Sequence, residues 1–150
     1  MSDRRYAFVM MIQNKYWQKF LQRSFDGLEV HSYVRRGFAG PSATLLLLFY
    51  VARPVGELAG YAEFIERSAG NVDEIWSKHS AESVLESKEQ YNALVRGVKH
   101  VSFIRFKNLH MAKDPLPLKS LLMMLGKKRL SRAGFYICRE NAEKLIALMD

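Results

Sequence analysis

The densest basic group in the sequence lies between positions 127 and 132. Lys127, Lys128, Arg129 and Arg132 follow a short apolar segment within six positions. A loop of this kind can contact several phosphates of a nucleic acid, and each contact releases counterions. The alternative is a solvated turn, because charge runs are usually exposed to water. We interpret the group as a candidate phosphate-binding loop.

A second group combines aromatic rings with cations. His31, Tyr33 and Arg35 alternate along a predicted strand with a polar, aromatic-bearing outer face, and Arg36 follows at the entrance to a glycine-containing loop. Aromatic and guanidinium planes stack well on unpaired bases. The alternative is that Tyr33 packs beneath a helix. The group predicts a surface on which an RNA base can stack.

The helix expected at 14–25 adds an aromatic pair flanked by lysines. Tyr16 and Trp17 are adjacent, so one of them must point away from the apolar stripe and is free to wall a pocket. The complete set of predicted RNA-binding residues is Lys15, Tyr16, Trp17, Lys19, His31, Tyr33, Arg35, Arg36, Lys127, Lys128, Arg129 and Arg132.

The sequence contains no residue pattern typical of catalysis or metal binding. Its four histidines are far apart and form no ligand pair. The single cysteine, Cys138, lies among apolar residues of a predicted strand and is expected to be a buried hydrophobe rather than a nucleophile. We therefore predict no catalytic residue, metal or cofactor. Lys15 or Lys19 near His31 is still a conceivable general-base arrangement for an enzyme.

Charge is distributed unevenly along the 150 residues. The chain has 23 Lys plus Arg against 15 Asp plus Glu, a net charge of +8, and the excess lies in the first and last thirds. If those thirds adjoin, they form one basic face that favours a polyanion such as RNA. The longest apolar run, 43–52, is too short to cross a membrane, and the lone cysteine favours a cytoplasmic protein without disulfides.

Hydrophobic periodicity predicts one domain, 1–150, with an acidic helical insertion at about 71–97. Strands are expected at 5–12, 28–36, 43–52, 57–66, 98–106 and 134–138, and helices at 14–25, 71–79, 84–95, 118–125 and 140–149. Asn14 is the expected N-cap of the first helix, and Asn71 with Glu74 resembles a capping box. Gly60 suggests a bulge or a close backbone approach, while Pro115 and Pro117 are expected to break the chain.

One stretch of the chain resembles a known superfamily. Residues 45–60, LLLLFYVARPVGELAG, resemble the signature of the PUA-like superfamily, which includes PUA, ASCH, EVE and YTH domains. Residues 115–149 resemble the proline-bearing turn, short strand and closing helix of EVE-like members. The resemblance implies an α+β fold, a PUA-like mixed β pseudo-barrel with flanking helices, which binds RNA or a modified base in a cleft between helix and strands. Small archaeal members are the nearest expected relatives.

The ASCH pattern G-x-K-x-x-E-x-R, which would begin at Gly27, is not kept. Glu29 replaces its lysine, Ser32 its glutamate and Val34 its arginine, which argues against the amidohydrolase activity that some ASCH members show. We therefore predict an RNA-binding or modified-nucleotide-binding module. The alternatives are a small hydrolase acting on a modified nucleoside, or a subunit whose basic face meets an acidic protein.

Overall fold

The computed structural model describes residues 3–150, in which six strands form one mixed sheet of order β2-β5-β4-β3-β1-β6. The strands are β1 (Ala7–Ile12), β2 (Val30–Arg36), β3 (Leu46–Val51), β4 (Glu57–Asn71), β5 (His100–Pro117) and β6 (Phe135–Ile137). The helices are α1 (Asn14–Phe25), α2 (Val72–His79), α3 (Lys88–Leu94), α4 (Leu118–Leu125) and α5 (Arg139–Met149), with 3-10 turns η1 (Asp3–Arg5) and η2 (Ser80–Glu82). The α+β architecture with flanking helices is as expected.

The apolar strand β1 lies inside the sheet. It pairs in parallel with β3, Ala7 opposite Leu46, and antiparallel with β6, Ala7 opposite Ile137. Its side chains alternate between two apolar clusters, with Phe8 in one and Val9 in the other. Burial on both faces explains why β1 and β3 are almost continuously apolar rather than alternating.

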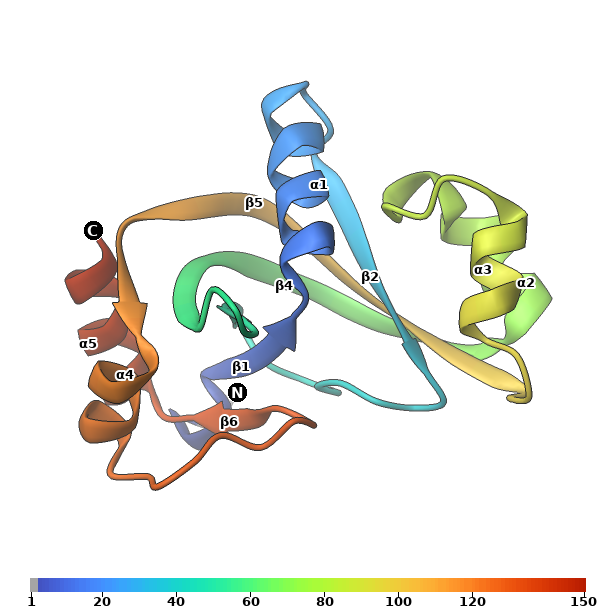
Figure 1. Ribbon diagram of the computed structural model, residues 1–150. Helices are drawn as coiled ribbons and strands as arrows, with labels where there is room; N and C mark the ends of the chain where they lie inside the picture. Colours follow the sequence, from blue (N-terminus) through green and yellow to red (C-terminus); the bar gives the residue numbers. More distant parts are fainter. Residues whose placement is uncertain (1–2) are drawn as a thin grey trace.

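Helices cover both faces of this part of the sheet (Figure 1). On one face, α1 buries Trp17 against Phe49 and Phe20 against Phe106, with ring centroids 5.2 Å apart in both pairs. On the other face, α4 and α5 pack buried leucines against β1, β3 and β4. Because α1 is amphipathic, the side chains beside its buried stripe are free to line a cavity.

The helical insertion packs at the end of the sheet that β2, β4 and β5 form, at the right of Figure 1. Asn71 accepts hydrogen bonds from the backbone N–H groups of Asp73 and Glu74, which confirms the predicted start of α2. Trp76 stacks on buried Tyr91 at 4.4 Å between ring centroids. Trp76 is thus a packing anchor of the insertion.

A group of polar residues, hereafter the Glu82 network, also ties the insertion to the sheet. Arg105 of β5 donates to both carboxylate oxygens of Glu82, at 2.8 and 2.9 Å, and lies 3.3 Å from Glu66. The Ser32 hydroxyl donates to Glu82 at 2.8 Å, and His79 Nδ1 lies 3.4 Å from the same carboxylate. Only 19% of the side-chain surface of Glu82 and of Arg105 is exposed, so the pair is largely shielded from water.

Pro115 and Pro117 do not break the chain as expected, because both lie within β5. The register between β4 and β5 shifts, so that Leu58 faces Leu116 whereas Gly60 faces Met111. Pro115 thus falls in the unpaired excursion, and Pro117 occupies the last position of the strand. Proline is tolerated at both places because no ladder N–H is required there.

Three local predictions, about a glycine, a helix cap and a cysteine, have different outcomes. A Cβ at Gly60 would collide with the carbonyl oxygen of His110 and the ring of Trp17, which confirms the close approach expected there. The N-cap of α1 is Gln13 rather than Asn14, which is the first helical residue. Cys138 likewise follows β6 and is the half-buried N-cap of α5 rather than a strand residue.

Candidate nucleic-acid interface

A cavity of about 740 Å³, hereafter the basic cavity, opens where β1 and β3 end. Because these strands are parallel, Gln13 after β1 and Ala52 and Arg53 after β3 emerge at the same edge of the sheet. Strand β2, helix α4 and the loop after α4 complete the wall. The cations that line it are Arg35, Arg53, Lys128, Arg129 and Arg132.

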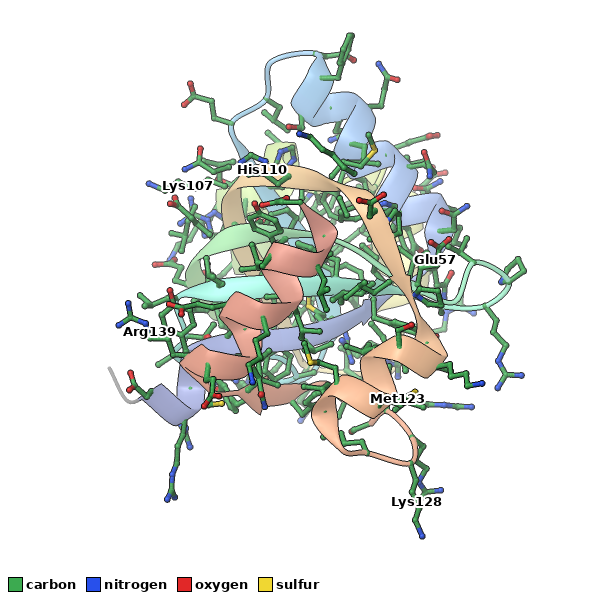
Figure 2. All side chains as sticks on the ribbon, turned by 90° about the vertical axis from the view of Figure 1, so that its left-hand side faces the viewer. Glu57, Lys107, His110, Met123, Lys128 and Arg139 are labelled. Atoms are coloured by element: carbon green, nitrogen blue, oxygen red, sulfur yellow. The ribbon has the colours of Figure 1, made fainter. Side chains whose placement is uncertain are left out.

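The loop after α4 turns back toward the cavity because of a glycine. Gly126 ends α4 in the left-handed conformation, φ 65°, and the Lys127 N–H donates to the Leu122 carbonyl oxygen. This is the common glycine-ended helix terminus. Figure 2 shows Lys128 projecting from the loop away from the body of the molecule. The loop therefore presents its cations to solvent, where an incoming anion can meet them.

Two tyrosines lie in the wall of the basic cavity. Burial raises the pKa of Tyr33, and the charge of Arg35 opposes this shift. Burial raises the pKa of Tyr50 as well, against the charge of Arg53. Both phenols are therefore protonated at neutral pH and able to donate a hydrogen bond to an anionic oxygen.

A second cavity of about 310 Å³, hereafter the insertion cavity, lies between β2, the start of α1 and the helical insertion. Gln13, Tyr33 and Arg35 line both cavities, so the two adjoin. The insertion supplies an aliphatic wall formed by Val84, Leu85 and Leu94. This cavity is therefore smaller and less basic than its neighbour.

Aromatic rings and cations meet on the other wall of the insertion cavity. The rings of Tyr16 and Tyr33 are 6.2 Å apart and inclined by 50°. The Arg35 guanidinium lies 5.8 Å from the centre of the Tyr33 ring, and Lys15 Nζ lies 5.0 Å from that of Tyr16. Arg36 lines the cavity and donates to the Leu94 carbonyl oxygen at 3.3 Å.

Seven of the twelve residues predicted for RNA binding line these adjoining cavities. They are Tyr16, Tyr33, Arg35, Arg36, Lys128, Arg129 and Arg132. Of the adjacent aromatic pair on α1, Trp17 is the core residue, 3% exposed, and Tyr16 is the one that walls a pocket. Residues distant in the sequence are thus brought to one continuous surface.

The other five predicted residues do not line the cavities. Besides Trp17, His31 is 1% exposed and packs against Phe20 and Phe106, so the face of β2 predicted to point outward is covered by α1. Lys15 is exposed above Tyr16. Lys19 is ion-paired with Glu86 at 3.0 Å, and Lys127 Nζ lies over the Phe135 ring at 3.5 Å.

The general-base arrangement considered for Lys15 or Lys19 beside His31 has no support in this geometry. Burial, and then the charge of Arg23, lower the pKa of His31, so the imidazole is neutral. It lies in the core and lines neither cavity. We therefore leave His31 and Trp17 out of the proposed interface.

Three residues at the centre of the site were not predicted from the sequence. Tyr50 and Arg53 lie inside the motif LLLLFYVARPVGELAG. The sequence signal for them was a tyrosine and an arginine at the end of an otherwise apolar strand. No sequence pattern indicated Gln13, because a single glutamine before a helix is common. Only the fold shows that it lines two cavities.

The described residues show neither a metal cluster nor a membrane helix. No group of three or more His, Cys, Asp or Glu side chains in residues 3–150 is arranged to hold a metal ion. None of the helices in that range is long and apolar enough to cross a membrane.

Comparison with known proteins yields one curated relative. No family model matches the chain. An ASCH domain-containing ribonuclease from Zymomonas mobilis is 23% identical over 146 residues, which cover 97% of this chain and 93% of that protein. This relative is bacterial, so the expected closeness to archaeal members is not supported.

The fold of this chain is similar to that of several solved structures. A variant of the Zymomonas mobilis ASCH protein superposes with a TM-score of 0.80 at 21% identity and covers all of both chains. The ASCH structure from the same organism has a TM-score of 0.78 at 19% identity over 97% of each chain. A protein from Rhodopseudomonas palustris reaches a TM-score of 0.52 at 12% identity over 96% of this chain and 92% of its own. The chain therefore has the mixed α+β fold of these ASCH structures.

Proposed function

We propose that this protein binds single-stranded RNA, with the phosphate backbone in the basic cavity. The observation that carries the proposal is that five cationic residues, from β2, the β3–β4 turn and the loop after α4, line one cavity. Of the described residues that line it, none is an aspartate or a glutamate. The ribonuclease activity named for the Zymomonas mobilis relative supports RNA rather than another polyanion.

Salt dependence provides the test. About four phosphate contacts to a single strand give a slope near −3 in a plot of log affinity against log salt. The triple variant Lys128→Ala, Arg129→Ala, Arg132→Ala should weaken binding of every RNA and flatten the slope by about 2. Fluorescence anisotropy with a labelled RNA of mixed sequence, titrated at several salt concentrations, measures both quantities.

A charge-matched variant separates this site from general basicity. Lys99, Lys107 and Lys113 are exposed and line neither cavity, and Figure 2 shows Lys107 far from Lys128. Their triple alanine variant removes the same three charges and should leave most of the affinity and slope intact. Equal weakening by the two triple variants, or no RNA binding at low salt, would contradict the proposal. The second result would favour an acidic protein as the partner.

RNA cleavage is the second candidate function, favoured by the curated ribonuclease relative. In such a step the 2′-hydroxyl of the RNA attacks the phosphorus and releases its proton to solvent water while the bond from phosphorus to the 5′-oxygen breaks. The cavity offers Tyr50, whose protonated hydroxyl would donate to the leaving 5′-oxygen and regain a proton from water, and Arg53, whose charge would stabilise the phosphorane. No histidine lines the described cavity, so the usual imidazole base is absent from it. If cleavage occurs here, Tyr50→Phe should slow it by about 10²–10⁴-fold while Tyr33→Phe slows it less. Gel analysis of end-labelled RNA distinguishes the two variants.

A further inference from the structure

An exposed aromatic residue lies in the loop between β2 and β3, outside both cavities. Phe38 is 57% exposed, although a phenylalanine ring in water forgoes the free energy of burial. Its ring packs on that of His100 at the start of β5, with 5.0 Å between the ring centroids and 31° between the planes. Because His100 is also exposed, the two rings form an aromatic surface in contact with solvent, hereafter the Phe38 platform.

Two strands hold the backbone of this loop in place. The buried Ser102 hydroxyl of β5 donates to the Gly37 carbonyl oxygen at 2.7 Å, and the Gly37 N–H donates to the His100 carbonyl oxygen at 2.9 Å. Arg67 of β4 donates to the carbonyl oxygen of Phe38 itself at 3.0 Å. The ring is therefore presented by an anchored backbone, which has little conformational freedom to lose when a ligand binds.

The Phe38 platform is continuous with the proposed RNA interface. Arg36 and Ala39, which lie on either side of Phe38 in the sequence, both line the insertion cavity. Arg35, three residues before Phe38, lines the basic cavity as well. Three residues of extended chain span at most about 11 Å. A short extension of an RNA strand that lies in the basic cavity is therefore long enough to reach the platform.

The loop around Phe38 has the chemistry of a nucleic-acid contact rather than of a protein contact. Its segment 35–42, RRGFAGPS, contains two arginines and no aspartate or glutamate, so a nearby phosphate meets no acidic side chain of this loop. The residues on either side of Phe38 are small, so the loop offers one isolated ring. A protein interface typically needs a broader apolar patch, whereas a base needs only a ring on which to stack.

We propose that the Phe38 platform stacks an unpaired base of the bound RNA outside the two cavities, without preference for a particular base. The inference rests on the proposed function, because the RNA backbone in the basic cavity brings the base to the platform. Stacking uses the face of the base, which all four bases have. The platform therefore adds affinity for longer RNA and leaves the salt dependence unchanged.

The experiment measures binding of labelled oligo(U) of increasing length by fluorescence anisotropy. Phe38→Ala should weaken binding of the longer RNAs about tenfold, within the range for one stacked base, and leave binding of the shortest ones unchanged. It should have no effect on an abasic oligonucleotide of the same length, which has the backbone charge but no bases. Phe38→Trp should restore the affinity, because tryptophan also stacks on a base. Phe25→Ala is the matched control, since Phe25 is 88% exposed at the end of α1 and lines neither cavity.

Thermal melts show that the variants are folded, and an exposed ring should contribute little to the melting temperature. Unchanged binding of long RNA by Phe38→Ala overturns the inference and favours a protein as the partner of the platform. An equal loss of affinity for the abasic oligonucleotide, an equal loss in Phe25→Ala, or no recovery in Phe38→Trp also overturns it. In each of these cases RNA binding in the basic cavity stands. Failure of the parent to bind any of the RNAs at low salt refutes the proposed function instead.

Discussion

The two ends of the sheet are held to their helices by different chemistry. At one end, α4 and α5 bury Leu121, Leu145 and Met149 completely against the strands. At the other, a smaller apolar cluster is supplemented by the ion pair between Glu82 and Arg105. Apolar burial depends little on pH, whereas an ion pair depends on protonation. The wall of the insertion cavity thus belongs to the end that is more sensitive to solution conditions.

The largest effect is expected at the apolar end. Leu145→Ala should lower the free energy of unfolding by about 2–5 kcal/mol, because a buried leucine loses its contacts and leaves a cavity. Leu148→Ala in the same helix is the matched control: Leu148 is 50% exposed, and its loss should cost less than about 0.5 kcal/mol. Urea denaturation at neutral pH measures both. Similar losses of unfolding free energy in the two variants would show that α5 does not cover the core.

A smaller and more local effect is expected at the ionic end. Glu82→Gln removes the charge that Arg105 faces, and we expect a loss of about 2 kcal/mol, below the ~3–5 kcal/mol of a fully buried pair because 19% of each side chain is exposed. Hydrogen exchange should show faster opening of α2 and α3, with α5 unaffected. Equal acceleration in α5 would mean that the two ends do not open separately.

The dependence of stability on pH sharpens the comparison further. Burial, and then the charge of Arg105, lower the pKa of His79 below its ordinary value of 6.5. Burial alone would raise the pKa of Glu82, but its hydrogen bonds to Arg105 and Ser32 outweigh this and lower it below 4.5. Both groups bind protons less tightly when folded than when unfolded, so acid favours unfolding.

The free energy of unfolding should therefore decline as the pH falls through about 6.5 and decline further below 4.5. His79→Gln should flatten the upper part of this decline, and Glu82→Gln the lower part. Leu145→Ala should shift the whole curve downward without changing its shape. Urea titrations between neutral pH and pH ~3 measure these curves. A parent protein whose free energy of unfolding stays constant over that range would contradict the assignment of the decline to His79 and Glu82.

The smallest effect is expected for an ion pair on the surface. Lys19 and Glu86 also connect the insertion to α1, at 3.0 Å, but 39% and 65% of their side chains are exposed. Glu86→Gln should cost at most about 0.5 kcal/mol, since water and salt screen such a pair. Thermal melts at low and high salt test this. A loss of stability as large as that of Glu82→Gln would mean that burial from water does not determine the strength of these ion pairs.

The fold class could be predicted from the sequence because its main signals are local. Continuous apolar runs predicted buried strands, and glycines and an asparagine marked several element ends correctly. The path of β5 could not be predicted, since the tolerance for Pro115 comes from the excursion in its pairing with β4. Likewise, alternation showed that His31 and Tyr33 share a face of β2, but only packing shows that α1 covers it.

The candidate site was predictable to the extent that its chemistry is concentrated in the sequence. The cations of the loop after α4 are adjacent, so the charge run was visible. Gln13, Tyr50 and Arg53 come from separate segments that meet only because β1 and β3 end at one edge of the sheet. The aliphatic wall of the insertion cavity resembles ordinary core residues, because an apolar side chain has the same sequence pattern whether it faces protein or a cavity.

The pairing of β1 with β6 has a consequence for how the polypeptide is made. Ala7 lies opposite Ile137, so β1 leaves the ribosome well before β6 and acquires this neighbour only when almost all of the described chain has been translated. Until then the AFVMMI segment has an unpaired edge that is rich in apolar residues. Contacts so distant in sequence form slowly because a long loop must close first. The open edge of β1 is therefore a place where nascent chains of this protein can associate with one another until β6 has emerged.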